Sequence, residues 1–242
     1  MSENVYKDIR LSLEEMCSLI YNASSADDLI EAGRRLEMLE TKLRNILKHR
    51  QNDAHAIFLL ASVYYQMAEL YLVNPEKRGK YQDRKKCEAL LEKAWRLAQQ
   101  TITINKDFVE AYWLLAEAIM RLIPFKGWKF AAVHGSNARE AVLHALQLSP
   151  RNPKAYVTLG KWYLFTPEEF GGSLDRALQI LQKAVELEAD NHETFLIHLW
   201  LGQVFLKKQD KLKAYNEIKQ ALSIYPNNIL AKTLADEVNE LT

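Results

Sequence analysis

The sequence predicts an all-α fold in which pairs of helices stack into a superhelix of about eleven helices. Glycine (8 residues) and proline (6 residues) are scarce for a chain of 242 residues, so little material is present for hairpins or long loops. Apolar residues make up 48% and charged residues 26%, which is ordinary for a globular protein with a substantial core. A pattern of small and bulky residues also recurs at a spacing of about 34 residues, which is typical of stacked helical repeats.

The clearest units of this pattern lie between Tyr156 and Pro226. The first half of each unit has a bulky residue, then Leu-Gly, then an aromatic residue. The second half has a bulky aliphatic residue with one alanine four residues before it and another three residues after it. The first unit is Tyr156, Leu159, Gly160 and Tyr163 with Ala177, Leu181 and Ala184, and the second is His198, Leu201, Gly202 and Phe205 with Ala214, Ile218 and Ala221. Because both halves keep one apolar face at helical spacing, each unit predicts a pair of packed helices.

These segments resemble the tetratricopeptide repeat. Two earlier units match the same pattern more loosely, with alanine in place of the first glycine. They are Tyr112, Leu115, Ala116 and Ile119 with Ala138, Val142, Ala145 and Pro150, and Ile57, Leu60, Ala61 and Tyr64 with a long helix that carries Leu91, Ala94, Ala98 and Thr101. The resemblance implies that the small residues let the second helix of a pair approach the first closely.

The chain is therefore expected to be a single domain over residues 1–242. Residues 1–50 read as a degenerate helix pair (5–21 and 26–49), and residues 51–226 as four tetratricopeptide-like units with insertions near 123–137 and 165–173. Residues 227–242 should form a capping helix from Ile229 to Leu241, because a solenoid must close its last apolar face.

The insertion at 165–173 predicts a tight elbow between two helices. Thr166 and Pro167 should end the first helix, the two glycines permit positive φ, and Ser173 should cap the next helix. The Phe170-Gly-Gly-Ser elbow resembles one found in stand-alone bacterial repeat proteins, among them the accessory T component of some tripartite solute transporters.

The insertion at 123–137 contains three aromatic residues, Phe125, Trp128 and Phe130, which do not suit a solvated loop. We expect this segment to fold onto an apolar surface or to meet a partner. Asn137 with Glu140 resembles a capping pair and predicts that the following helix begins there.

The resemblance also implies a site, because the inner groove of tetratricopeptide proteins is lined by first-helix residues one and eight places after the leading bulky residue. Here those positions are all apolar or aromatic, while the positions five places after it carry Ser62, Glu117, Lys161 and Gln203. The lysine and asparagine clamp of chaperone-binding relatives is therefore absent. The predicted partner-binding set is Phe58, Tyr65, Trp113, Glu117, Met120, Val157, Lys161, Leu164, Leu199 and Gln203.

An apolar groove of this kind has two interpretations. The insertions and the N-terminal helix pair could cover it and make it core, or it could bind a peptide, an amphipathic helix or a hydrophobic small molecule. The expected function is a non-enzymatic scaffold for a protein or peptide partner. The alternative is a carrier of an apolar small molecule, in the manner of the transporter T component.

Composition excludes several other classes. A net charge of +1 and a pI near 7.7 do not favour nucleic-acid binding. The two cysteines have no CxxC spacing, the 6 histidines form no i, i+4 pair or HExxH, and no phosphate loop or nucleophile elbow occurs. We therefore expect no cofactor, no metal and no catalysis.

Cellular placement is also an expectation from the sequence. No apolar run reaches the roughly 20 residues that span a bilayer, and the first eight residues contain no apolar signal segment. The sequence thus predicts a cytoplasmic protein, or a periplasmic one if a leader has been removed.

Overall fold

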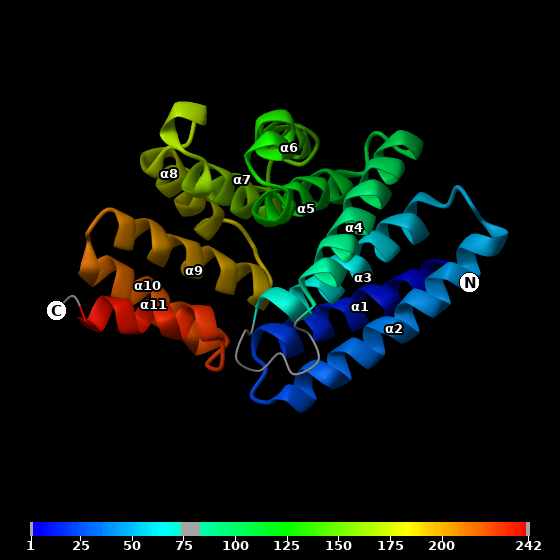
Figure 1. Cartoon of the computed structure of the whole chain (residues 1–242), viewed down its shortest axis with the longest axis horizontal. Helices are drawn as coiled ribbons and strands as arrows, with labels where there is room; N and C mark the ends of the chain where they lie inside the picture. Colours follow the sequence, from blue (N-terminus) through cyan, green and yellow to red (C-terminus); the bar gives the residue numbers. More distant parts are fainter. Residues whose placement is uncertain (1, 74–82, 241–242) are drawn as a thin grey trace. The chain divides into compact units, whose positions relative to one another are not determined.

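The computed structural model describes residues 2–73 and 83–240, and in this part of the chain the regular structure is entirely helical. Eleven α-helices and one short 3-10 helix are present there, which confirms the predicted all-α class (Figure 1). The chain divides into two compact units, Met1–Ala141 and Val142–Thr242, and each is described by itself.

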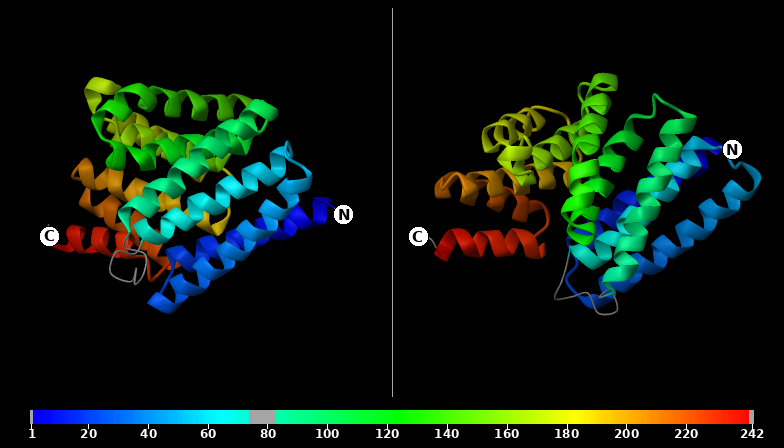
Figure 2. Two further views of the ribbon diagram at one scale, coloured as in Figure 1. Left: turned by 45° about the vertical axis from the view of Figure 1, so that its right-hand side comes forward. Right: turned by 45° about the horizontal axis from the view of Figure 1, so that its top comes forward.

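Unit 1 consists of long helices paired in chain order. α3 packs against both α1 and α2, and α4 packs between α3 and α5 (Figures 1 and 2). The helices are α1 (Ser2–Tyr21), α2 (Ala26–His49), α3 (Ala54–Leu72), α4 (Arg84–Ile104), α5 (Val109–Lys126) and α6 (Trp128–Leu148), the last of which continues into unit 2. The first two helices match the predicted pair within a few residues.

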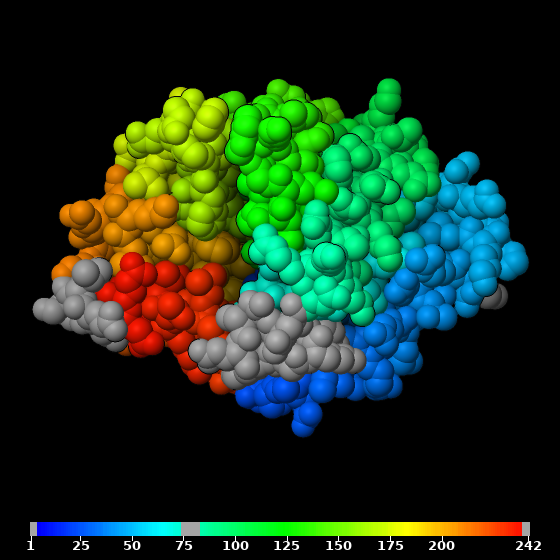
Figure 3. Space-filling view, in the orientation of Figure 1, coloured from blue at the N-terminus to red at the C-terminus, as the bar shows by residue number. Residues whose placement is uncertain are grey.

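Unit 2 has shorter helices in the same alternation. α7 pairs with α8 and α9 with α10, while α11 packs on α10 and α9 as the predicted cap. The elements are α7 (Pro153–Phe165), η1 (Glu168–Phe170), α8 (Leu174–Val185), α9 (Asn191–Lys207), α10 (Lys211–Ile224) and α11 (Ile229–Glu240). In Figure 3 the orange surface of α10 adjoins the red surface of α11. The α11 residues Ala231, Leu234 and Val238 are buried.

Side-chain caps fix where many helices begin. Ser25 and Asp28 form a capping box at α2, and Asp190 and Glu193 form another at α9. At the other capped helices a single side chain accepts a hydrogen bond from a backbone N–H three residues on, as in Asp53, Asp83, Asn152, Ser173 and Asp210.

The repeat glycines of unit 2 allow the close helix contacts that the pattern predicts. A Cβ built on Gly160 would lie 2.6 Å from the Leu181 side chain, and one on Gly202 would lie 2.6 Å from Ile218. The second helix of each pair therefore occupies the space that any other residue would need.

The insertion near 123–137 lengthens two helices. α5 continues through Pro124 to Lys126, Gly127 turns the chain with a φ of 78°, and α6 starts at once at Trp128. The prediction of a helix start at Asn137 is wrong, because that residue lies inside α6. A helix that already begins at Trp128 satisfies the backbone at this point, so no cap is needed.

The aromatic residues of this insertion fold onto α4. The rings of Phe130 and His134 lie 5.7 and 5.1 Å from Trp95, both edge to face. Arg84 stacks 4.5 Å from the Phe125 ring and donates a hydrogen bond of 2.6 Å to the carbonyl of Pro124. Only Trp128 stays largely in solvent, with 76% of its surface exposed.

The insertion at 165–173 forms the predicted elbow. Thr166 ends α7, Gly171 has a φ of 94°, and the Ser173 side chain caps α8. Gly172 is required for a different reason, because a Cβ there would lie 1.7 Å from the carbonyl oxygen of Thr166. Its amide instead donates to Pro167, which closes the loop on itself.

Candidate partner-binding face

The predicted partner-binding residues of unit 1 come together on two neighbouring first helices. Phe58 and Tyr65 lie on α3, and Trp113, Glu117 and Met120 lie on α5, which packs against α3. Phe58 meets Trp113 edge to face at 6.4 Å, and the Tyr65 hydroxyl donates to Glu117 at 3.2 Å. We call these five residues the unit 1 face.

α1 covers one end of the unit 1 face. Phe58 is buried because Arg10 stacks on its ring at 5.7 Å and Phe108 lies 5.0 Å from it. Arg10 also pairs with Glu110 of α5 at 3.4 Å, so it contacts both first helices at this end. The expectation that the N-terminal pair could cover the groove therefore holds for Phe58, whereas Tyr65, Trp113 and Met120 remain partly exposed.

A buried polar network lies beside this face and joins three successive first helices. Glu69 on α3 accepts hydrogen bonds from the Tyr21 hydroxyl of α1 at 2.7 Å and from Arg121 of α5 at 3.1 Å. The Glu69 side chain is 2% exposed, whereas Arg121 keeps 28% of its side-chain surface in solvent. Glu69 therefore anchors the network from within, and Arg121 forms its open edge.

The network fixes the protonation of its members. Burial raises the pKa of Tyr21 and of Tyr65 well above the usual value for a phenol, and the nearby Glu69 carboxylate adds to the rise. Burial acts to lower the pKa of Arg121, but Glu69 and the two tyrosines outweigh it and the pKa is raised. At neutral pH the network thus holds neutral phenols beside a charged guanidinium.

Sequence reasoning found Tyr65 and Glu117 but missed Tyr21, Glu69 and Arg121. A usable signal was present, because Glu69 follows Tyr65 by four residues and Arg121 follows Glu117 by four. Residues at this spacing share a helix face. α3 and α5 are a turn or more longer than α7, so their faces extend past the last groove position of a standard repeat.

The predicted residues of unit 2 also lie on neighbouring first helices, but most are buried. Val157, Lys161 and Leu164 come from α7 and Leu199 from α9, and all four are less than a tenth exposed. The Lys161 ammonium lies 5.5 Å from the centre of the Trp200 ring, which the exposed Phe165 also meets edge to face at 5.4 Å. Within this set only Gln203 remains partly exposed.

Neither a metal cluster nor a membrane span is found in the part of the chain that the structure describes. No three His, Cys, Asp or Glu side chains gather there in a way that could hold a metal ion. No helix there is both long and apolar enough to cross a bilayer.

Solved structures with a similar fold include a tetratricopeptide protein. TTC0263 of Thermus thermophilus, a thermophilic protein of this class, matches with a TM-score of 0.63 at 17% identity over 89% of this chain and 100% of its own. Human IFIT1, solved as a dimer with m7Gppp-AAAA, matches with a TM-score of 0.60 at 14% identity over 91% of this chain and 47% of its own. At these identities the likeness shows a shared tetratricopeptide fold.

Comparison of sequences identifies the family. No curated protein matches the chain. The model of the family described as regulator of microtubule dynamics protein 1-3 matches residues 23–168, which is more than half of the chain and includes α3, α4 and α5. The chain belongs to the regulator of microtubule dynamics protein 1-3 family.

Proposed function

We propose that this protein is a non-enzymatic scaffold that binds a segment of a partner protein on the unit 1 face. The observation that carries the proposal is that Tyr65, Trp113 and Met120 stay partly exposed on two adjacent first helices, next to a hydrogen-bonded polar network. Aromatic and methionine side chains with an arginine at their edge are the composition that protein interfaces favour.

The chemistry of the face favours a peptide over a purely apolar ligand. Arg121 presents guanidinium N–H groups at the open edge of the network, and a carboxylate or backbone carbonyl can accept from them. An apolar small molecule placed here would strip water from Arg121 without replacing its hydrogen bonds, which is costly. A segment with apolar side chains for Trp113 and Met120 and an acceptor for Arg121 meets both needs.

The family's description makes the microtubule the first partner to test. We propose that the partner segment belongs to tubulin in the microtubule wall. In co-sedimentation with stabilised microtubules, the wild-type protein should pellet saturably. A Trp113→Ala/Met120→Glu variant should bind at least tenfold more weakly, because loss of a central contact costs about 2 kcal/mol.

A matched control keeps this test specific. Met38 on α2 is 60% exposed and lies outside the face, so Met38→Glu repeats the methionine-to-glutamate change of the face variant without touching the proposed site. This control should pellet like the wild type, and circular dichroism should show that all variants are folded. Equal pelleting by the face variant would overturn the site, and no pelleting by the wild type would overturn the microtubule as partner.

A further inference from the structure

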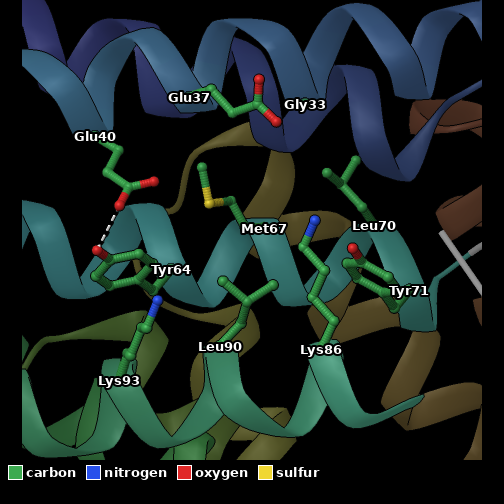
Figure 4. Close-up of a pocket in the computed structure, with 10 residues that line it drawn as sticks. All are labelled: Gly33, Glu37, Glu40, Tyr64, Met67, Leu70, Tyr71, Lys86, Leu90 and Lys93. Carbon is green, nitrogen blue, oxygen red and sulfur yellow. Dashed lines mark hydrogen bonds between the residues drawn. The ribbon is translucent and has the colours of Figure 1, made fainter. Parts of the chain in front are cut away.

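A second candidate site lies within unit 1, on the side of α3 that faces α2 and α4. A cavity of about 160 Å³ opens there between the three helices (Figure 4). Its lining residues are Gly33, Glu37 and Glu40 from α2, Tyr64, Met67, Leu70 and Tyr71 from α3, and Lys86, Leu90 and Lys93 from α4. The cavity is distinct from the unit 1 face, with which it shares no residue.

The walls of this cavity carry opposite charges. α2 supplies two carboxylates, Glu37 and Glu40, and α4 supplies two ammonium groups, Lys86 and Lys93. The floor between them is largely apolar and comes from Met67 and Leu70 of α3. Figure 4 shows the two charged walls on either side of this floor.

One end of the cavity is satisfied by internal contacts. The Tyr64 hydroxyl donates to Glu40 at 2.7 Å, and Arg44 donates to both, at 2.6 Å to Tyr64 and 2.8 Å to Glu40. The Lys93 ammonium lies 4.9 Å from the centre of the Tyr64 ring. These groups hold one another, so a ligand gains little by displacing them.

The other end is engaged less fully, because its Lys86 ammonium has a hydrogen bond with the Tyr71 hydroxyl that acts to lower the pKa of that phenol. No hydrogen bond or ion pair engages the Glu37 carboxylate within residues 2–73 and 83–240. In Figure 4 the Glu37 carboxylate and the Lys86 ammonium lie on opposite sides of the cavity, and Lys86 points into it from below. No ion pair joins the two within the same described residues. Gly33 stands on the α2 wall and adds no side chain to fill the space.

We propose that this cavity binds a compact zwitterion of the α-amino-acid class with an apolar side chain. Its ammonium group meets Glu37, its carboxylate meets Lys86, and its side chain rests on Met67, Leu70 and Leu90. A ligand with a single charge leaves one of the two side chains without an opposite charge. An anion is repelled by the Glu37 carboxylate, and a cation is repelled by the Lys86 ammonium. A purely apolar ligand would desolvate both charges without return.

The volume of the cavity limits the ligand's size. An apolar cavity of about 150 Å³ accommodates a benzene molecule, so about six side-chain and backbone atoms fit inside while the charged groups reach the mouth. Leucine, methionine and phenylalanine are of this size. With about nine heavy atoms and an ordinary ligand efficiency, the expected dissociation constant is on the order of a millimolar.

The test uses the full-length protein labelled with ¹³C in its methionine methyl groups. Met67 lies on the cavity floor, and a Met67→Leu variant assigns its signal. Titration with L-leucine should shift the Met67 signal saturably. N-acetyl-leucine lacks the ammonium group and leucinamide lacks the carboxylate, so each should bind at least tenfold more weakly.

Protein variants locate the two charges. Glu37→Gln and Lys86→Gln should each weaken leucine binding at least tenfold, whereas Lys85→Gln, an exposed neighbour that does not line the cavity, should leave it unchanged. Glu37 is on the surface, so its substitution is not expected to prevent folding, and circular dichroism checks this.

The proposal is overturned if leucine, methionine and phenylalanine leave the Met67 signal unmoved at 20-fold the expected dissociation constant, about 20 mM. It is also overturned if leucinamide binds as well as leucine, or if both glutamine variants bind as the wild type does.

Discussion

At the residue scale, helix propensity favours alanine at Gly160 and Gly202, whereas packing favours glycine. The distance to the neighbouring helix decides which effect is larger. Replacing either by alanine gains about 1 kcal/mol of helix propensity. The new methyl group, however, would stand 2.6 Å from Leu181 or Ile218, both almost fully buried and without room to retreat. Overpacking of this kind costs about 1–3 kcal/mol. We expect each substitution to lower the free energy of unfolding by about 1 kcal/mol net, measured by urea denaturation.

Gly135 provides the matched control for these variants. It also lies inside a helix, but a Cβ there meets no atom within 4 Å. Gly135→Ala should therefore stabilise the protein by about 0.5–1 kcal/mol, since only the propensity gain remains. A stabilising Gly160→Ala would show that the second helix of the pair is not fixed as closely as the structure indicates.

The raised pKa values of two tyrosines lead us to expect that the free energy of unfolding falls at alkaline pH. Burial, together with carboxylates at Asp53 and Glu40, raises the pKa of Tyr6 and of Tyr64 from 10.0 to about 12. In the unfolded chain these phenols lose their protons near pH 10, so the stability that the two tyrosines contribute is complete below that pH and is lost as the pH rises from 10 through 12. Urea denaturation at pH 9, 10 and 11 should show this fall, and it should be shallower in a Tyr6→Phe/Tyr64→Phe variant. An equally steep fall in the variant would assign the effect to other groups.

The elbow between α7 and α8 shows at the element scale that its two glycines serve different needs. Gly171 needs its positive φ, which asparagine also adopts at modest cost, whereas Gly172 needs the absence of a Cβ against the Thr166 carbonyl. Gly172→Ala should therefore cost about 2 kcal/mol or more of unfolding free energy, and Gly171→Asn less than about 1 kcal/mol. Urea denaturation of the two variants measures the difference, and an equal cost would mean that the elbow opens readily.

The two insertions also show which parts of an element the sequence can predict. The 165–173 elbow could be predicted because Thr166, Pro167 and Ser173 act on the backbone next to them. The 123–137 segment could not, because the continuation of α5 and α6 depends on the contacts of Phe130 and His134 with the distant Trp95. Local capping signals such as Asn137 are overridden when such packing already extends the helix.

The same distinction holds at the scale of the whole molecule. Repeat spacing placed the helices and brought Phe58 to Trp113 and Tyr65 to Glu117, since those contacts follow from stacking equivalent positions. The Glu69–Arg121 pair and the cavity beside Glu37 and Lys86 lay outside the pattern. The first could have been found by following the faces of α3 and α5 one turn further, whereas the cavity combines side chains from three helices, which the periodicity of one helix does not encode.

Helix α6 leads to an expectation about the stability of the complete chain. It runs unbroken through the boundary between Ala141 and Val142, so its own backbone hydrogen bonds continue from one unit into the other. We propose that the chain unfolds as a single domain, with circular dichroism at 222 nm and tryptophan fluorescence following one coincident transition. Glu140→Pro, at an exposed position inside α6, should cost about 3 kcal/mol and separate the two signals, whereas Glu140→Ala should keep them together. Two transitions in the wild-type protein would mean that the units fold independently and that α6 only tethers them.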